Sequence, residues 1–92
     1  MPVKTTPFDA AEYLETDEDI KIFLRDAAED GNAEVFLHAL NTVARAKGMT
    51  EIAKKAGLTR ASLYKALAEG ANPRFDTINK VTRALGCKLA VV

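Results

Sequence analysis

The chain has 92 residues, of which 48% are apolar, and its formal net charge is zero. This length suits one small domain, and a single cysteine, Cys87, excludes an internal disulfide framework and indicates a reducing compartment. Because the chain has neither a run of about 18 apolar residues nor a signal-peptide pattern at its start, we expect a cytoplasmic protein without a membrane partner.

Five or six helices are predicted in chain order. Residues 9–14 fit a short helix, and Thr16 begins a capping box in front of an amphipathic helix that ends near Gly31. Asn32 caps a third helix, expected over residues 33–47 and stopped by Gly48. Two short helices then meet at Gly57. A last helix ends at Gly86, with an expected apolar face of Phe75, Ile78, Val81 and Leu85.

The C-terminal residues 88–92 are short, apolar and partly β-branched, which favours a β-strand. Because a lone strand is unstable, we expect it to pair with its copy in a second chain. Leu89 and Val91 are the residues predicted to contribute to such a homodimer.

Charge is divided between the two parts of the chain. Residues 1–32 carry nine acids and three bases, whereas residues 33–92 carry four acids and ten bases. This asymmetry favours two different partners, one of them anionic, although charged helices that only keep the protein soluble are the simpler alternative. We therefore distinguish an N-terminal arm with an acidic helical segment, residues 1–32, from a core with the C-terminal strand, residues 33–92, within one compact domain.

Residues 49–70 hold the most specific local pattern. Ala53 occupies the place where the two short helices cross, Gly57 lies in the turn four residues later, and Thr59 is the expected N-cap of the second helix. This layout resembles the helix-turn-helix of the phage-repressor-like DNA-binding family. Over residues 8–92 the chain also resembles one branch of that family, the addiction-module antidotes (HigA-like antitoxins), with the tail ANPRFDTINKVTRALGCKLAVV and the upstream segment FDAAEYLETDEDIKIFLRDAAEDGN. Arg74 departs from the preferred N-cap residues at the start of the last helix.

The resemblance implies an all-α fold with a repressor-like core over residues 33–86. It also implies an antitoxin of a type II toxin–antitoxin pair, which binds operator DNA, represses its own operon and neutralises a small, basic, ribonuclease-like toxin. Two alternatives stay open: a stand-alone transcriptional repressor, and a protein-interaction module whose helix-turn-helix does not bind DNA.

The second helix of this motif is the predicted DNA reader. Residues four apart share a helix face, so Arg60 lies over Tyr64, and Ala61 over Lys65, away from the apolar residues that must face the core. We predict that these four residues read bases, with Arg60 on guanine and the small Ala61 allowing close approach. Tyr64 as a half-buried packing residue is the alternative. The candidates for phosphate contacts are Thr50, Thr59, Ser62, Asn72, Arg74 and Lys55.

The acidic segment is the predicted toxin-binding region, because a duplex repels it and a basic toxin attracts it. The apolar anchors would be Phe8, Tyr13 and Leu14, and the charged contacts Glu12, Glu15 and Asp17. The alternative is that the three apolar residues simply pack against the core.

Nothing in the sequence indicates an enzyme, a cofactor or a metal site. The only histidine, His38, has no second histidine or neighbouring cysteine with which to share a metal ion, and no phosphate-binding glycine loop is present. We therefore expect a binding protein without catalytic residues.

Overall fold

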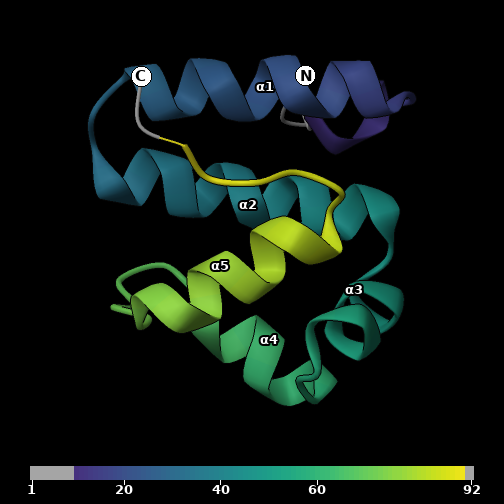
Figure 1. Ribbon diagram of the computed structural model, residues 1–92, viewed down its shortest axis with the longest axis vertical. Coiled ribbons are helices and arrows are strands. Elements are labelled where there is room, and N and C mark those ends of the chain that lie inside the picture. The colour runs from purple at the N-terminus through teal and green to yellow at the C-terminus, as the bar shows by residue number, and fades with distance from the viewer. Residues whose placement is uncertain (1–9, 91–92) are drawn as a thin grey trace, which may run out of the picture.

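The structure is a computed structural model that describes residues 10–90, and within that range it is all-helical, as predicted. A short 3₁₀ helix is followed by five α-helices (Figure 1). Their bounds are η1 Ala10–Tyr13, α1 Asp17–Glu29, α2 Ala33–Lys47, α3 Met49–Ala56, α4 Arg60–Ala66 and α5 Phe75–Ala84. No helix among residues 10–90 is both long and apolar enough to cross a membrane.

The helices begin where local hydrogen bonding favours it. At the start of α1, the Thr16 hydroxyl accepts a hydrogen bond from the Asp19 amide at 3.0 Å, and the Asp19 carboxylate accepts one from the Thr16 amide at 3.1 Å. This reciprocal pair is the predicted capping box. The Asn32 side chain accepts from the Glu34 amide at 2.8 Å and caps α2, also as predicted.

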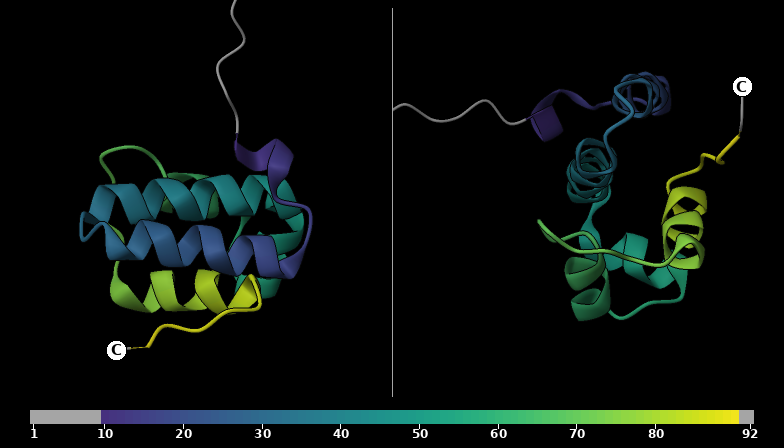
Figure 2. Two further views of the ribbon diagram at one scale, coloured as in Figure 1. Left: turned by 90° about the horizontal axis from the view of Figure 1, so that it is seen from above. Right: turned by 90° about the vertical axis from the view of Figure 1, so that its left-hand side faces the viewer.

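Two groups of helices build the molecule. Helices α1 and α2 lie side by side, with η1 also packed on α2, while α3 contacts α2, α4 and α5 (Figures 1 and 2). The core runs through both groups, because Ile20 and Leu24 of α1 belong to the same buried cluster as residues of the later helices. The central members of this cluster are Leu40, Val43, Ile52, Leu63 and Val81. The acidic helix α1 lies on the side of α2 that faces away from α4 (Figures 1 and 2).

The start of α5 corrects one prediction. Val81 and Leu85 are buried and Ile78 is half-buried, but Phe75 is 71% exposed. Phe75 is the first residue of α5, one turn before Ile78, so the helix begins outside the region that the other helices cover. The sequence pattern places Phe75 on the correct helix face, but nothing in this chain covers that end of the face.

The C-terminal tail also differs from the prediction, since no strand forms within the described part of the chain. After Gly86 the tail turns and runs back in the direction from which α5 came (Figures 1 and 2). A strand needs a neighbouring strand for its backbone hydrogen bonds, and residues 10–90 supply none. Leu89 is 37% exposed, and Val91 lies outside the described residues.

Candidate nucleic-acid interface

The turn between α3 and α4 is supported by its own backbone. Gly57 has φ +74°, in the left-handed region, and ends α3. The Leu58 amide donates to the Ala53 carbonyl at 2.8 Å, the bond that closes a Schellman-type helix end. Leu58 then packs partly buried against the core. The predicted place of Gly57 in the turn is thus confirmed, Leu58 closes the turn behind it, and the turn aims α4 away from α3.

Thr59 is the N-cap of α4, as predicted. Its hydroxyl oxygen accepts from the Ser62 amide at 3.0 Å, and the same hydroxyl donates to Ser62 Oγ at 2.8 Å. Both side chains are exposed, but their hydroxyl groups are used by the start of the helix. A phosphate near this end of α4 would therefore meet the backbone amides of the first turn rather than freely rotating hydroxyls.

Helix α4 is held by one buried side and by its C-terminal end. Leu63 is fully buried, and Leu67, directly after the helix, is 2% exposed. The Asn41 side chain of α2 donates to the Leu67 carbonyl at 3.4 Å, a contact between residues 26 positions apart. Sequence reasoning did not identify Asn41, because only the packing of α2 against the end of α4 shows its role.

The opposite side of α4 carries the four predicted base-reading residues, and all four are exposed. We call this set the α4 outer face: Arg60, Ala61, Tyr64 and Lys65. Arg60 Nη2 donates to Tyr64 Oη at 3.1 Å, and the Arg60 guanidinium carbon lies 5.3 Å from the centre of the Tyr64 ring. Tyr64 is 41% exposed and its ring contacts Arg60, which fits both a residue that contacts DNA and the alternative of a half-buried packing residue.

The phosphate candidates belong to several parts of the chain. Thr50 is exposed in the first turn of α3, and Asn72 is exposed in the connection between α4 and α5. Arg74 is the N-cap of α5, as its position suggested, but its side chain makes no capping hydrogen bond. Its guanidinium is therefore left to contact solvent or a partner.

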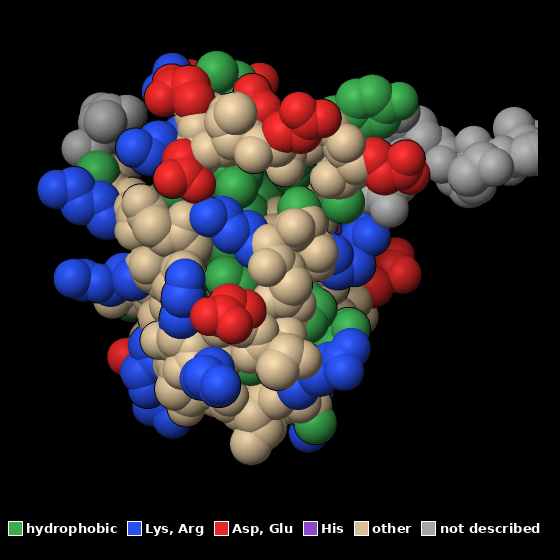
Figure 3. Space-filling model, turned by 90° about the vertical axis from the view of Figure 1, so that its right-hand side faces the viewer, with side chains coloured by type: hydrophobic (Ala, Val, Ile, Leu, Met, Phe, Trp, Pro, Cys, Tyr) green, Lys and Arg blue, Asp and Glu red, His purple; other side chains and the backbone are tan. Residues whose placement is uncertain are grey.

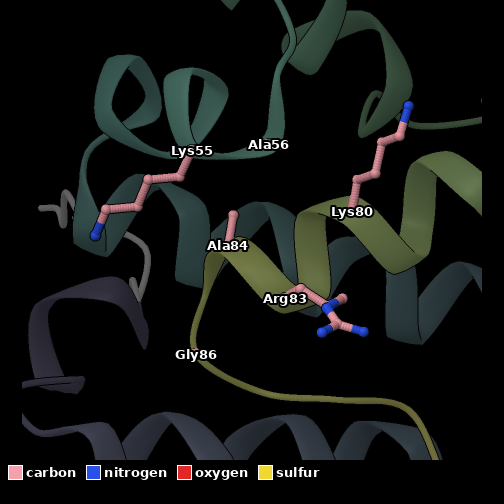
Figure 4. Close-up of a pocket in the computed structure, with 6 residues that line it drawn as sticks. All are labelled: Lys55, Ala56, Lys80, Arg83, Ala84 and Gly86. Carbon is pink, nitrogen blue, oxygen red and sulfur yellow. The ribbon is translucent and has the colours of Figure 1, made fainter.

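Lys55 lies at a basic cleft that the sequence did not reveal. The cleft, about 500 Å³ in volume, lies between α3 and α5 and is lined by Lys55, Lys80 and Arg83 around a floor of small residues, Ala56, Ala84 and Gly86 (Figure 4). Lys80 and Arg83 are three residues apart on α5, a spacing that indicates a shared face but not its proximity to Lys55. Lys80 also pairs with Asp76 at 3.2 Å, and the charged ends of the three cations point in different directions. The cleft extends the positively charged surface, but its three cationic side chains do not point at one place where an anion could bind.

Charge is segregated in space as well as along the chain. On the face shown in Figure 3, acidic side chains gather mainly at the end formed by α1, whereas most basic side chains cover the rest of that face. An anionic partner is therefore favoured at the α3, α4 and α5 end and disfavoured at α1.

The predicted toxin-binding residues of the N-terminal segment have different environments. Tyr13 is 65% exposed, and Glu12 and Glu15 are also exposed. Leu14 packs partly buried against the core, as the alternative interpretation expected for it. Phe8 lies outside the described residues.

Asp17 connects the acidic segment to the core. Its carboxylate pairs with Lys47 Nζ, near the end of α2, at 3.1 Å. The side chain of Asp17 is nevertheless 82% exposed, so the pair is open to solvent. Such a pair contributes less than about 1 kcal/mol and leaves Asp17 accessible to a partner.

Among residues 10–90, no three or more histidine, cysteine, aspartate or glutamate side chains are grouped so that they could hold a metal ion. His38 is exposed on α2. The described surface thus offers charge, hydrogen-bond donors and one aromatic–arginine pair for recognition.

A model of the family described as probable addiction module antidote protein matches residues 4–92, and the chain belongs to this family. An uncharacterized protein of Haemophilus influenzae (strain ATCC 51907 / DSM 11121 / KW20 / Rd) is 43% identical over 91 residues, which cover 99% of this chain and 94% of that protein. No solved structure matches the chain significantly. Membership in an antidote family supports an antitoxin role and implies a toxin as partner, and proteins of such families are generally not enzymes.

Proposed function

We propose that this chain is the antitoxin of a type II toxin–antitoxin pair and that it represses its own operon by binding operator DNA through α4. The observation that supports DNA binding most directly is the α4 outer face. Four exposed residues suited to reading bases lie on a helix whose other side is anchored by the fully buried Leu63.

In this proposal α3 and α4 form a helix-turn-helix, and α4 enters the major groove. Arg60 donates two hydrogen bonds to a guanine, and the Tyr64 hydroxyl holds the guanidinium in position before DNA arrives. A guanidinium has five N–H donors, so one bond to Tyr64 leaves enough donors for a base. Ala61 lets the helix approach closely, and Lys65 contacts a base edge or the backbone.

The remaining contacts would be to phosphates. The backbone amides at the start of α4, near Thr59 and Ser62, would face the phosphates of the DNA, together with Thr50, Asn72 and Arg74. Lys55 adds attraction that does not depend on sequence, reinforced by the neighbouring Lys80 and Arg83. As a two-fold dimer, the protein would place two α4 helices in successive major grooves, about 34–36 Å apart.

The acidic segment would serve the second partner, a small basic toxin. Exposed Glu12 and Glu15 lie close to the exposed ring of Tyr13, so charge and an apolar anchor occur together. The charge would accelerate association more than it strengthens the final complex, and the ring would supply contact area. Leu14 contributes less directly, because it already packs against the core.

The DNA part of the proposal is tested with the full chain and a duplex from the region upstream of its own gene. We expect a mobility shift on this duplex at protein concentrations that leave a shuffled duplex of equal composition free. Equal binding to both duplexes at every salt concentration would contradict sequence-specific repression.

The toxin part requires local charge reversal rather than truncation, because Ile20 and Leu24 of the N-terminal region belong to the core. The test variant is Glu12→Lys with Glu15→Lys, and the matched control is Glu29→Lys with Asp30→Lys, which changes net charge equally at the other end of α1. We expect the test variant to lose affinity for the toxin and the control to keep most of it. If both variants bind the toxin equally well, residues 12–15 are not the contact surface.

A further inference from the structure

Phe75 is exposed beyond what the fold of one chain requires. Its side chain is 71% exposed at the first position of α5, the most exposed of the large apolar residues in the described part of the chain. Burying a phenylalanine side chain is favourable, and most of that favourable burial is unrealised in the single chain. An apolar side chain in this situation indicates an interaction surface when it adjoins further apolar area.

Such area lies directly beside it. A cavity of about 180 Å³ opens between the start of α2, the α4–α5 connection and α5. Its walls are mainly apolar, with Ala33, Phe36, Leu37, Ala71, Pro73 and Ile78, and its polar residues are Glu34 and Asn72. Two lining residues flank Phe75 in the chain, Pro73 two residues before it and Ile78 one helical turn after it, so the cavity borders the start of α5 where the ring is exposed. Figure 2 shows the starts of α2 and α5 and the connection at the same end of the molecule.

We propose that this end is the interface of a two-fold homodimer in which Phe75 of each chain inserts into the cavity of the other. A two-fold interface uses the same patch on both partners, so the patch must carry both a projecting group and a matching hollow. This patch carries both. The size also agrees, because an apolar protein cavity of about 150 Å³ is large enough to hold a benzene ring.

Charge complementarity favours a second copy as the occupant. Arg74 precedes Phe75 and is exposed, while Glu34 lies on the cavity wall and is also exposed. Neither side chain forms an ion pair among residues 10–90. In the dimer without DNA, when Phe75 enters the partner's cavity, Arg74 approaches the Glu34 carboxylate of that partner, and the symmetry makes the contact twice.

The expected dimer is modest in size. Each phenylalanine buries about 150–250 Å², and with the cavity walls the two contacts give an interface at or below about 1,200 Å² in total. Interfaces of that class associate weakly, so we expect a micromolar dissociation constant in the absence of DNA. This inference needs neither DNA nor toxin binding, and it assigns the dimer contact to α5 rather than to Leu89 in the tail.

Sedimentation equilibrium of the full chain, from low to several hundred micromolar, tests the proposal. Phe75→Ala should raise the dissociation constant of the dimer at least about tenfold, as loss of a central aromatic anchor does. Tyr13→Ala, which removes a similarly exposed aromatic ring on η1 that does not line the cavity, should leave the constant unchanged. Because Phe75 is exposed, far-ultraviolet circular dichroism should show an unaltered helix content for the variant.

A charge exchange tests the geometry itself. Glu34→Arg and Arg74→Glu should each weaken the dimer, and the two substitutions combined in one chain should restore it, because the cross-pair is then reversed at both contacts. A wild-type chain that is monomeric over the whole range would overturn the proposal. So would a dimer that Leu89→Asp dissociates and Phe75→Ala leaves intact, or a loss of toxin binding by Phe75→Ala without any change in self-association.

Discussion

The substitution Arg60→Ala should weaken operator binding without changing the stability of the fold. Arg60 is exposed, and the partner of its side-chain hydrogen bond, Tyr64, is exposed as well. Its removal opens no cavity, so the free energy of unfolding should change by less than about 0.5 kcal/mol. On the operator the variant loses a bidentate contact of about 1–3 kcal/mol, which corresponds to a roughly 5- to 150-fold weaker complex.

Two further variants, Tyr64→Phe and Lys55→Ala, provide comparisons for the effect of Arg60→Ala on DNA binding. Tyr64→Phe keeps the ring beside the guanidinium but removes the hydroxyl that accepts from Arg60 at 3.1 Å. It should weaken operator binding by about 0.5–1.5 kcal/mol, less than Arg60→Ala does. Lys55→Ala should weaken operator and shuffled DNA equally and reduce the salt dependence by about one phosphate contact.

Fluorescence anisotropy with operator and shuffled duplexes at several salt concentrations measures all three variants. The decisive quantity is the specificity ratio, the dissociation constant for shuffled DNA divided by that for the operator. We expect Arg60→Ala to lower this ratio and Lys55→Ala to preserve it. An unchanged ratio for Arg60→Ala would refute the assignment of Arg60 as a base reader.

Three predictions concern stability, all measured by urea unfolding. Leu63→Ala should cost about 2–5 kcal/mol, because Leu63 is fully buried, and a cost below about 1 kcal/mol would show that α4 is not anchored there. Gly57→Ala should cost about 1 kcal/mol because of the left-handed backbone alone, since the added Cβ would meet no atom within 4 Å. Gly57→Asn should cost less, because asparagine tolerates this backbone conformation better than alanine. A larger cost for Gly57→Asn than for Gly57→Ala would contradict backbone strain as the cause. Asp17→Asn should cost less than about 1 kcal/mol despite the 3.1 Å pair with Lys47, because the carboxylate is 82% exposed.

Features that depend on near neighbours in the chain were predictable from the sequence. The Thr16 capping box, the Asn32 and Thr59 caps and the left-handed Gly57 each involve residues within three or four positions. The pairing of Arg60 with Tyr64 follows from helix periodicity for the same reason. The antidote resemblance is confirmed by the family match over residues 4–92, while the HigA-like assignment and the membership in the phage-repressor-like helix-turn-helix family stay predictions.

Features that depend on tertiary packing were missed or mistaken. Helix periodicity assigned Phe75 to the core face, but it does not show where along that face the neighbouring helices end. The hydrogen bond from Asn41 to Leu67 spans 26 positions in the chain. The cleft that Lys55 shares with Lys80 and Arg83 depends on how α3 packs against α5. The roles of the individual candidate residues in DNA, toxin and dimer contacts are predictions that only binding experiments address.

Co-expression with the neighbouring reading frame tests the antitoxin role most directly. If that role is correct, a short frame beside this gene encodes a basic protein that arrests growth when it is induced alone. Growth should return when the full chain is induced with it, and the two proteins should purify as one complex. A neighbouring protein that arrests growth equally with and without this chain, or one that has no effect on growth, would contradict the account.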